Sequence, residues 1–141
     1  MTISQRITTY HEKSNHEGEF ILYWMTSARR SKRNFALQEA IREGNESQKP
    51  VIVVEALSLE HRWANDRSHT FVLQGMLDNR EAFESSNVTY IPYVETQRGE
   101  GKGLLASFLE RAHLLFIDDY PTYLPKIITP NTIVLAKCHV R

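Results

Sequence analysis

The sequence contains one cysteine, no long apolar run and no excess of charge of either sign. Cys138 therefore has no partner for an internal disulfide. No segment approaches the ~20 consecutive apolar residues of a membrane-spanning helix, and the N-terminus lacks the apolar core of a signal peptide. The 17 basic and 17 acidic residues cancel, so no global field would attract nucleic acid. From these absences we expect a cytoplasmic protein with no membrane partner.

The apolar residues that are present fall into stretches of two alternating kinds. Some form continuous β-branched and aromatic runs, and others recur at helical spacing. This alternation predicts an α/β domain in which a parallel sheet carries helices on both faces. The 141 residues suffice for one such domain. We assign residues 19–141 to it and interpret the polar residues 1–18 as a loosely packed N-terminal arm.

Five stretches are expected to be strands. The first begins at Phe20 and gives way to polar and basic residues by Arg30. It is the most apolar of the five, which predicts a central strand buried on both faces. Pro92 cannot donate a hydrogen bond to a neighbouring strand, so the third strand is expected at an edge. The other four expected strands are Pro50–Leu57, Val88–Val94, Leu114–Ile117 and Thr132–Lys137.

Helices are expected between these strands. Thr26 or Ser27 can cap the first helix, and Asn65 or Asp66 can cap a long second helix that reaches about Glu84. The two remaining expected helices are Leu104–His113 and a short one that starts within Tyr120–Pro125.

The junction of the first strand and its helix is the expected ligand site, because open parallel sheets bind ligands at the carboxyl ends of their strands. Trp24 stands at this strand end, where its indole can either stack on a planar ligand or pack in the core. Asn34 can hydrogen-bond a ligand ring or tie down the first helical turn.

A basic cluster follows Trp24. Arg29 and Arg30, with Lys32 and Arg33 behind them, stand at a helix start, where the helix dipole disfavours cations. The cluster therefore indicates an anion, which is either the acidic tail of a ligand or the pair Asp118 and Asp119 across a crevice. A solvated helix face is the alternative.

Two other interpretations of this edge fit less well. Asp118 and Asp119 could hold Mg²⁺ as in receiver domains, but Met25-Thr26-Ser27 stands where such a fold needs acidic residues. Gly99–Gly103 suggests a phosphate loop, yet it lacks the Lys-Ser/Thr ending, and a flexible turn is the better interpretation.

Short motifs follow one another in order between Phe20 and Pro125. They are Tyr23-Trp24-Met25, Arg29-Arg30, Asn34-Phe35-Ala36-Leu37, Trp63-Ala64-Asn65-Asp66-Arg67-Ser68-His69, Phe71-Val72-Leu73-Gln74-Gly75-Met76, Gly101-Lys102-Gly103-Leu104-Leu105, Asp119-Tyr120-Pro121 and Leu124-Pro125. As an ordered set they resemble the N-terminal α/β antenna domain of the DNA photolyase and cryptochrome family, specifically its class II-like bacterial branch.

The resemblance implies a Rossmann-like, five-stranded parallel sheet of order 3-2-1-4-5, whose winding reverses between the first and fourth strands. It also implies an antenna pigment, either a deazaflavin or methenyltetrahydrofolate, in a crevice lined by Trp24–Arg30 and Asp118–Pro125. The residues that it implies for pigment binding are Trp24, Met25, Arg29, Arg30, Asn34, Asp118, Asp119, Tyr120 and Pro121.

Photolyases bind FAD and damaged DNA through a helical C-terminal domain, to which nothing in this sequence can be assigned. We therefore expect a module without catalysis of its own, acting either as an antenna-pigment domain or as a scaffold. Its expected partner is the missing FAD domain, within a longer protein of which the chain is a fragment, or a second copy of a natural stand-alone domain. DNA is expected to be reached only through the full-length protein. The alternatives are a nucleotide-binding protein of the universal-stress type and a pure interaction domain.

Overall fold

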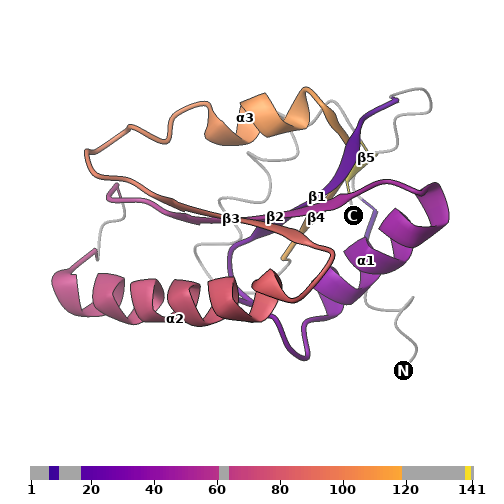
Figure 1. Cartoon of the computed structure of the whole chain (residues 1–141). Helices are drawn as coiled ribbons and strands as arrows, with labels where there is room; N and C mark the ends of the chain where they lie inside the picture. Colours follow the sequence, from indigo (N-terminus) through magenta and orange to yellow (C-terminus); the bar gives the residue numbers. More distant parts are fainter. Residues whose placement is uncertain (1–6, 10–16, 61–63, 119–138, 141) are drawn as a thin grey trace.

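The computed structural model describes residues 7–9, 17–60, 64–118 and 139–140. Four strands form a parallel sheet, β1 (Phe20–Met25), β2 (Val51–Leu57), β3 (Thr89–Val94) and β4 (Ala112–Ile117), and the two-residue β5 (His139–Val140) pairs with β4. The helices are α1 (Phe35–Ser47), α2 (Asp66–Glu84) and α3 (Leu104–Leu109). The strand order is β3-β2-β1-β4-β5 (Figure 1).

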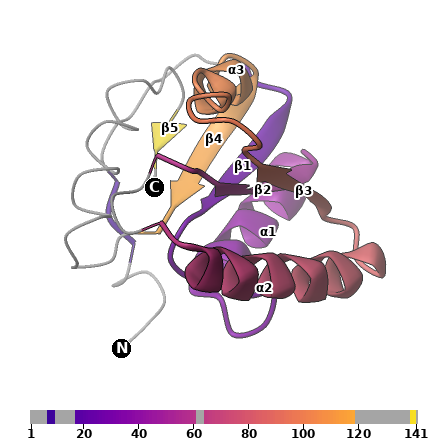
Figure 2. The same cartoon turned by 90° about the vertical axis from the view of Figure 1, so that its left-hand side faces the viewer.

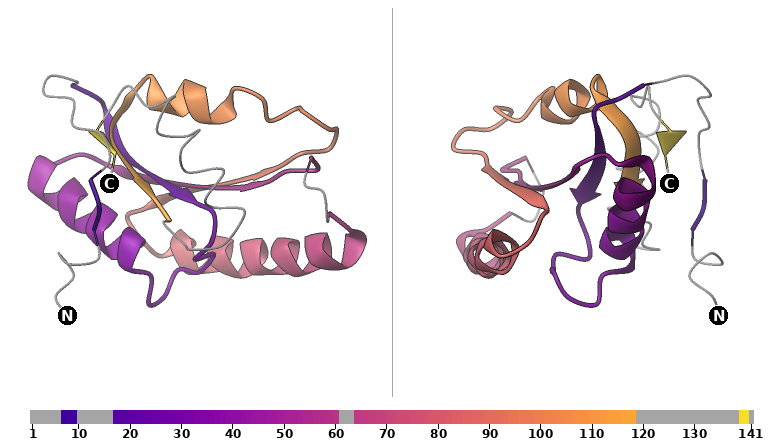
Figure 3. Two further views of the ribbon diagram at one scale, coloured as in Figure 1. Left: turned by 180° about the vertical axis from the view of Figure 1, so that it is seen from behind. Right: turned by 45° about the vertical axis from the view of Figure 1, so that its right-hand side comes forward.

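The helices lie in two layers, with α1 and α2 on one face of the sheet and α3 on the other (Figures 1 and 3). Alternate side chains of β1 enter the two resulting cores. Tyr23 packs with residues of α1 and α2, whereas Leu22 packs with α3. The double burial explains why this strand is apolar at every position rather than at every second one.

The α/β class, the parallel sheet and the helices on both faces are confirmed. β1 lies between β2 and β4, and β3 lies at an edge, as Pro92 predicts. The predicted strand Thr132–Lys137 and the predicted helix start at Tyr120–Pro125 lie outside the described residues, as does most of the 1–18 arm. Within the described ranges, no helix is long and apolar enough to cross a membrane.

The start of α1 corrects a prediction. The cap is Asn34, whose side-chain oxygen accepts the Leu37 amide at 3.0 Å, rather than Thr26 or Ser27. Thr26 and Ser27 instead belong to an extended β1–α1 loop that comes before the helix. The second predicted cap is confirmed, because Asn65 accepts the Ser68 amide at 2.9 Å in a capping box.

The region between α3 and β4 corrects another prediction. α3 ends at Leu109 instead of continuing to His113, and β4 begins at Ala112 instead of Leu114. Ala112 is fully buried beside Phe20, so sheet pairing extends the strand into residues whose spacing fits a helix equally well.

Candidate functional site

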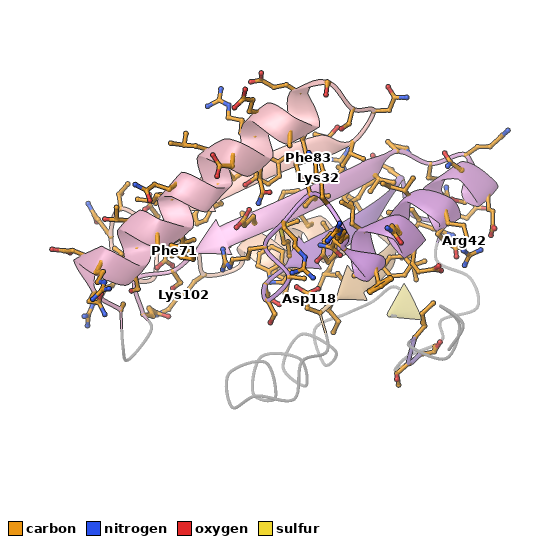
Figure 4. The ribbon with its side chains drawn as sticks, turned by 90° about the horizontal axis from the view of Figure 1, so that it is seen from below. Lys32, Arg42, Phe71, Phe83, Lys102 and Asp118 are labelled. Carbon is orange, nitrogen blue, oxygen red and sulfur yellow. The ribbon has the colours of Figure 1, made fainter. Side chains whose placement is uncertain are left out.

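The β1–α1 loop is held by Asp118, the buried residue that directly follows β4 (Figure 4). One carboxylate oxygen, Oδ2, accepts the amides of Thr26, Ser27 and Ala28 at 3.0, 2.7 and 3.0 Å. The other oxygen accepts the Tyr23 hydroxyl at 2.8 Å. Three successive amides that converge on one oxygen form an anion-binding nest, and here the anion is the protein's own carboxylate. Asp118 therefore joins β4 to the loop after β1.

Asn34 holds the same loop from the helix side. Its side-chain nitrogen donates to the Tyr23 hydroxyl at 2.9 Å and to the carbonyls of Ala28 and Arg30 at 2.9 and 3.1 Å. Burial and the nearby Asp118 carboxylate raise the pKa of Tyr23 well above its usual value. Asn34 thus ties down the first helical turn, which is the structural one of its two predicted roles.

Arg29 pairs with a carboxylate that the sequence analysis missed. Its guanidinium lies 3.1 Å from Glu55 Oε1 and also donates to the Thr26 and Ala56 carbonyls. Glu55 is only 1% exposed and accepts two further hydrogen bonds, from Asn79 at 2.9 Å and Tyr90 at 2.7 Å. Arg29 is therefore directed at Glu55 on β2 and not at Asp118, which was one of the anions that the sequence analysis left open.

Glu55 also affects its tyrosine neighbour. Burial and the hydrogen bond to Glu55 raise the pKa of Tyr90 well above its usual value. A buried carboxylate is tolerated in a strand only when its oxygens are paired in this way. The sequence does contain a signal for the role of Glu55, because it is the one charged residue in an otherwise apolar strand.

A cavity of about 240 Å³ lies on the α3 face, at the carboxyl ends of β1, β2 and β3. Trp24, which is partly buried, and Tyr93 supply aromatic walls. The aliphatic wall comes from the end of β2 and from α3, chiefly Leu57, Leu104 and Leu105. Polar lining residues are Ser58, Glu60, Glu95 and Lys102.

The loops that frame the cavity are joined by Glu95. Its carboxylate accepts the Ser58 hydroxyl at 2.8 Å and the Leu59 amide at 2.7 Å on one side, and the Gly101 amide at 3.0 Å on the other. These bonds, that of Leu59 above all, lower the pKa of Glu95 below its usual value. The β2–α2 and β3–α3 loops are therefore fixed to each other at the mouth of the cavity.

A side chain at Gly101 would crowd this arrangement. A Cβ atom there would lie 2.9 Å from the Glu95 carboxylate and 3.1 Å from the Tyr93 ring. The Gly99–Gly103 segment is a turn, as expected, and its Gly101 amide is already bonded to a protein carboxylate. Such an amide is not free to cradle a phosphate.

The structure describes six of the nine predicted site residues and brings one of them, Trp24, to the cavity. Met25 is buried on the opposite face of β1, near Asn79. Arg30 is exposed in the β1–α1 loop. Asp119, Tyr120 and Pro121 lie outside the described residues. Of the predicted crevice wall Asp118–Pro125, the structure therefore describes only Asp118. Within the described ranges, no group of three or more His, Cys, Asp or Glu side chains is placed to hold a metal ion.

Apart from Trp24, the residues that line the cavity were not predicted as site residues, and Tyr93, Glu95 and Lys102 are among those missed. Glu95 and Lys102 follow the end of the third strand, so the rule that parallel strands present ligand sites at their carboxyl ends could have found them. The predicted site instead used the ends of the first and fourth strands, and the glycine-rich loop after the third strand was interpreted as a flexible turn.

The fold and the cavity define a Rossmann-like α/β domain with an aromatic-walled pocket at the carboxyl edge of its sheet. No family model matches the chain. The chain is 32% identical over 80 residues to the deoxyribodipyrimidine photo-lyase of Methanothermobacter thermautotrophicus. The matched segment is 57% of this chain and 18% of the photo-lyase, so the chain corresponds to a small part of that relative.

The fold is also similar to a solved structure from the universal stress protein family of Burkholderia pseudomallei. The TM-score is 0.53 at 16% sequence identity, and the match covers 86% of this chain and 92% of the other. At this identity the likeness shows a shared fold.

Proposed function

We propose that this chain is a photolyase-like antenna domain that binds the ring of a planar pigment in the cavity beside Trp24. The observation that carries the proposal is the partly buried Trp24 indole, which faces a cavity at the strand ends together with Tyr93. Aromatic faces at a pocket favour a planar conjugated ligand, since stacking adds to the area buried. The partial similarity to a photo-lyase supports the photolyase-like class, and the pigment is the ligand that the resemblance to photolyase antenna domains implies.

The expected pigments are a deazaflavin or methenyltetrahydrofolate. The cavity of about 240 Å³ is smaller than the roughly 300–1,000 Å³ of most small-molecule sites, so it suits a ring system more than an entire pigment. The domain is proposed to have no catalysis of its own. Within this proposal, FAD and DNA are reached only through a C-terminal FAD domain, and a second copy of the chain is the alternative partner.

The test is an absorption titration of the full 141-residue chain with 5-deazariboflavin and with methenyltetrahydrofolate. We expect a shift of the pigment's visible or near-ultraviolet band, and a loss of affinity of about 10-fold in Trp24→Ala, because a stacked ring contributes ~0.5–1.5 kcal/mol beyond its buried area. Phe71→Ala is the matched control, since Phe71 is an aromatic on α2 that is 77% exposed and is not among the cavity residues. A chain that shifts neither pigment would be a scaffold instead.

A nucleotide-binding function of the universal-stress type is the second candidate, favoured by the shared fold. The β1–α1 nest is a natural phosphate site, but Asp118 already fills it. A phosphate would have to displace this carboxylate. Under our proposal ATP leaves the melting temperature unchanged, whereas a nucleotide-binding protein would be stabilised by its ligand.

A further inference from the structure

Two exposed side chains of opposite charge stand at the mouth of the cavity. The Lys102 ammonium lies 3.7 Å from Glu60 Oε1, and the two side chains are 78% and 52% exposed. A pair this long and this exposed is weak, because solvent screens it and both side chains lose freedom when they form it. Each partner can therefore exchange the other for a ligand group at little cost.

The other polar groups of the cavity are already committed. Glu95 accepts three hydrogen bonds from the two framing loops. The Ser58 hydroxyl donates one of these bonds and accepts the Glu60 amide at 3.2 Å. Among the described residues that line the cavity, Lys102 is thus the cation that can turn toward a ligand.

The size of the cavity decides where the rest of a ligand goes. A cavity of about 240 Å³ suits a ring system, so a substituent on that ring has to leave through the mouth. Lys102 and Glu60 stand there. Gly99, with φ +80°, supports this arrangement, since a Cβ atom would lie 3.2 Å from Lys102 Cε and 3.3 Å from Glu60 Oε1. Because glycine has no Cβ atom, the Lys102 side chain has room to move between Glu60 and a ligand.

We infer that the cavity selects a planar aromatic ligand that carries an anionic group, and that Lys102 exchanges Glu60 for this group when the ligand binds. The inference rests on the proposed function, which it extends from the ring to its substituent. A phosphate and a carboxylate share the chemistry that Lys102 recognises, which is a charge-assisted hydrogen bond from the ammonium. Glu60 acts against both, because it is the anion that the ligand must replace.

The experiment compares a neutral ring with its charged derivative. The wild-type chain, Lys102→Met and Glu60→Gln are titrated with 5-deazariboflavin and with its 5′-phosphate. We expect the phosphate to bind the wild type about 3- to 5-fold tighter than the neutral compound, a factor typical of one exposed ion pair. Lys102→Met should abolish this preference, and Glu60→Gln should increase it. Added salt should reduce it.

The neutral compound should bind all three proteins equally, which shows that the substitutions leave the cavity intact. Lys32→Met, an exposed lysine in the β1–α1 loop outside the cavity, is the matched control and should keep the preference. Methenyltetrahydrofolate forms a second arm, since its tail carries carboxylates. If Lys102→Met weakens the binding of methenyltetrahydrofolate but not that of the 5′-phosphate, the anion that Lys102 recognises is a carboxylate rather than a phosphate.

The outcomes separate this inference from the proposed function. Equal binding of neutral and charged ligands, unaffected by Lys102→Met in either arm, would overturn the role of Lys102 while leaving ring binding in place. Equal losses for the neutral and charged compounds in Lys102→Met would assign the lysine a structural role and would also overturn the inference. If no ligand binds the wild type, the proposed function fails and the inference fails with it.

Discussion

Single buried polar residues fix the loop that follows β1. Asp118 accepts hydrogen bonds from the amides of the loop, and Asn34 donates hydrogen bonds to its carbonyls. Glu55 forms an ion pair with Arg29, the arginine of the loop. The contacts of Asp118 and Glu55 could not be read from the sequence, because the Asp118 bonds join residues about 90 positions apart and the Glu55 bonds bring together four elements or loops. The sequence did offer the alternative that Asn34 ties down a helical turn, since asparagine is a common cap.

The substitution Glu55→Gln tests how much one such buried polar residue contributes to stability. The substitution keeps the shape of the side chain but leaves the Arg29 guanidinium, whose side chain is 28% exposed, without its counter-charge. We expect the free energy of unfolding to fall by ~3 kcal/mol, the lower end of the range for breaking a buried ion pair, because Arg29 keeps some contact with water. Urea unfolding measures the change. Glu84→Gln, at a 69% exposed side chain, should change the stability by less than ~0.5 kcal/mol, and a similar small effect for Glu55→Gln would contradict the account.

At the scale of elements, the strands were predicted better than the helix ends. Pro92 identified the edge strand, and the uniformly apolar β1 identified the centre, since both signals act through the sheet itself. The boundary between α3 and β4 was missed, because Ala112 and His113 fit either element and pairing with β1 decides between them. The cavity was missed for a related reason, because the β2–α2 and β3–α3 loops are brought together by long-range contacts of Glu95 and of the Lys102–Glu60 pair.

Glu95→Gln tests this connection through pH. The pKa of Glu95 is lowered in the folded state, so its bonds stabilise the fold above the ordinary carboxyl pKa of about 4.3, and this contribution is lost as the pH falls through the folded-state value. We expect wild-type stability to drop on acidification in that window, and the drop to be smaller in Glu95→Gln. Thermal unfolding between pH 7 and pH 3 measures both curves. Parallel curves for the two proteins would show that Glu95 does not link the loops.

On the scale of the whole molecule, the described helices cover the two faces of the sheet unequally (Figure 2). α1 and α2 have 13 and 19 residues, whereas α3 has six and is only about 9 Å long. A six-residue strand extends about 20 Å, so α3 cannot cover β1 along its length. The cavity beside Trp24 opens on this less covered face. A ligand site there follows from the lengths of the helices as much as from any one side chain.

The position of the ligand is the most direct test of the account. A ¹⁵N–¹H correlation spectrum of the labelled chain, recorded with and without 5-deazariboflavin, reports it residue by residue. We predict that the indole N–H of Trp24 and the amides of Leu104–Ala106 shift together, while the amides of Thr26–Ala28 stay in place against Asp118. Shifts confined to the Thr26–Ala28 amides, or no shift at Trp24 at a saturating ligand concentration, would contradict the account.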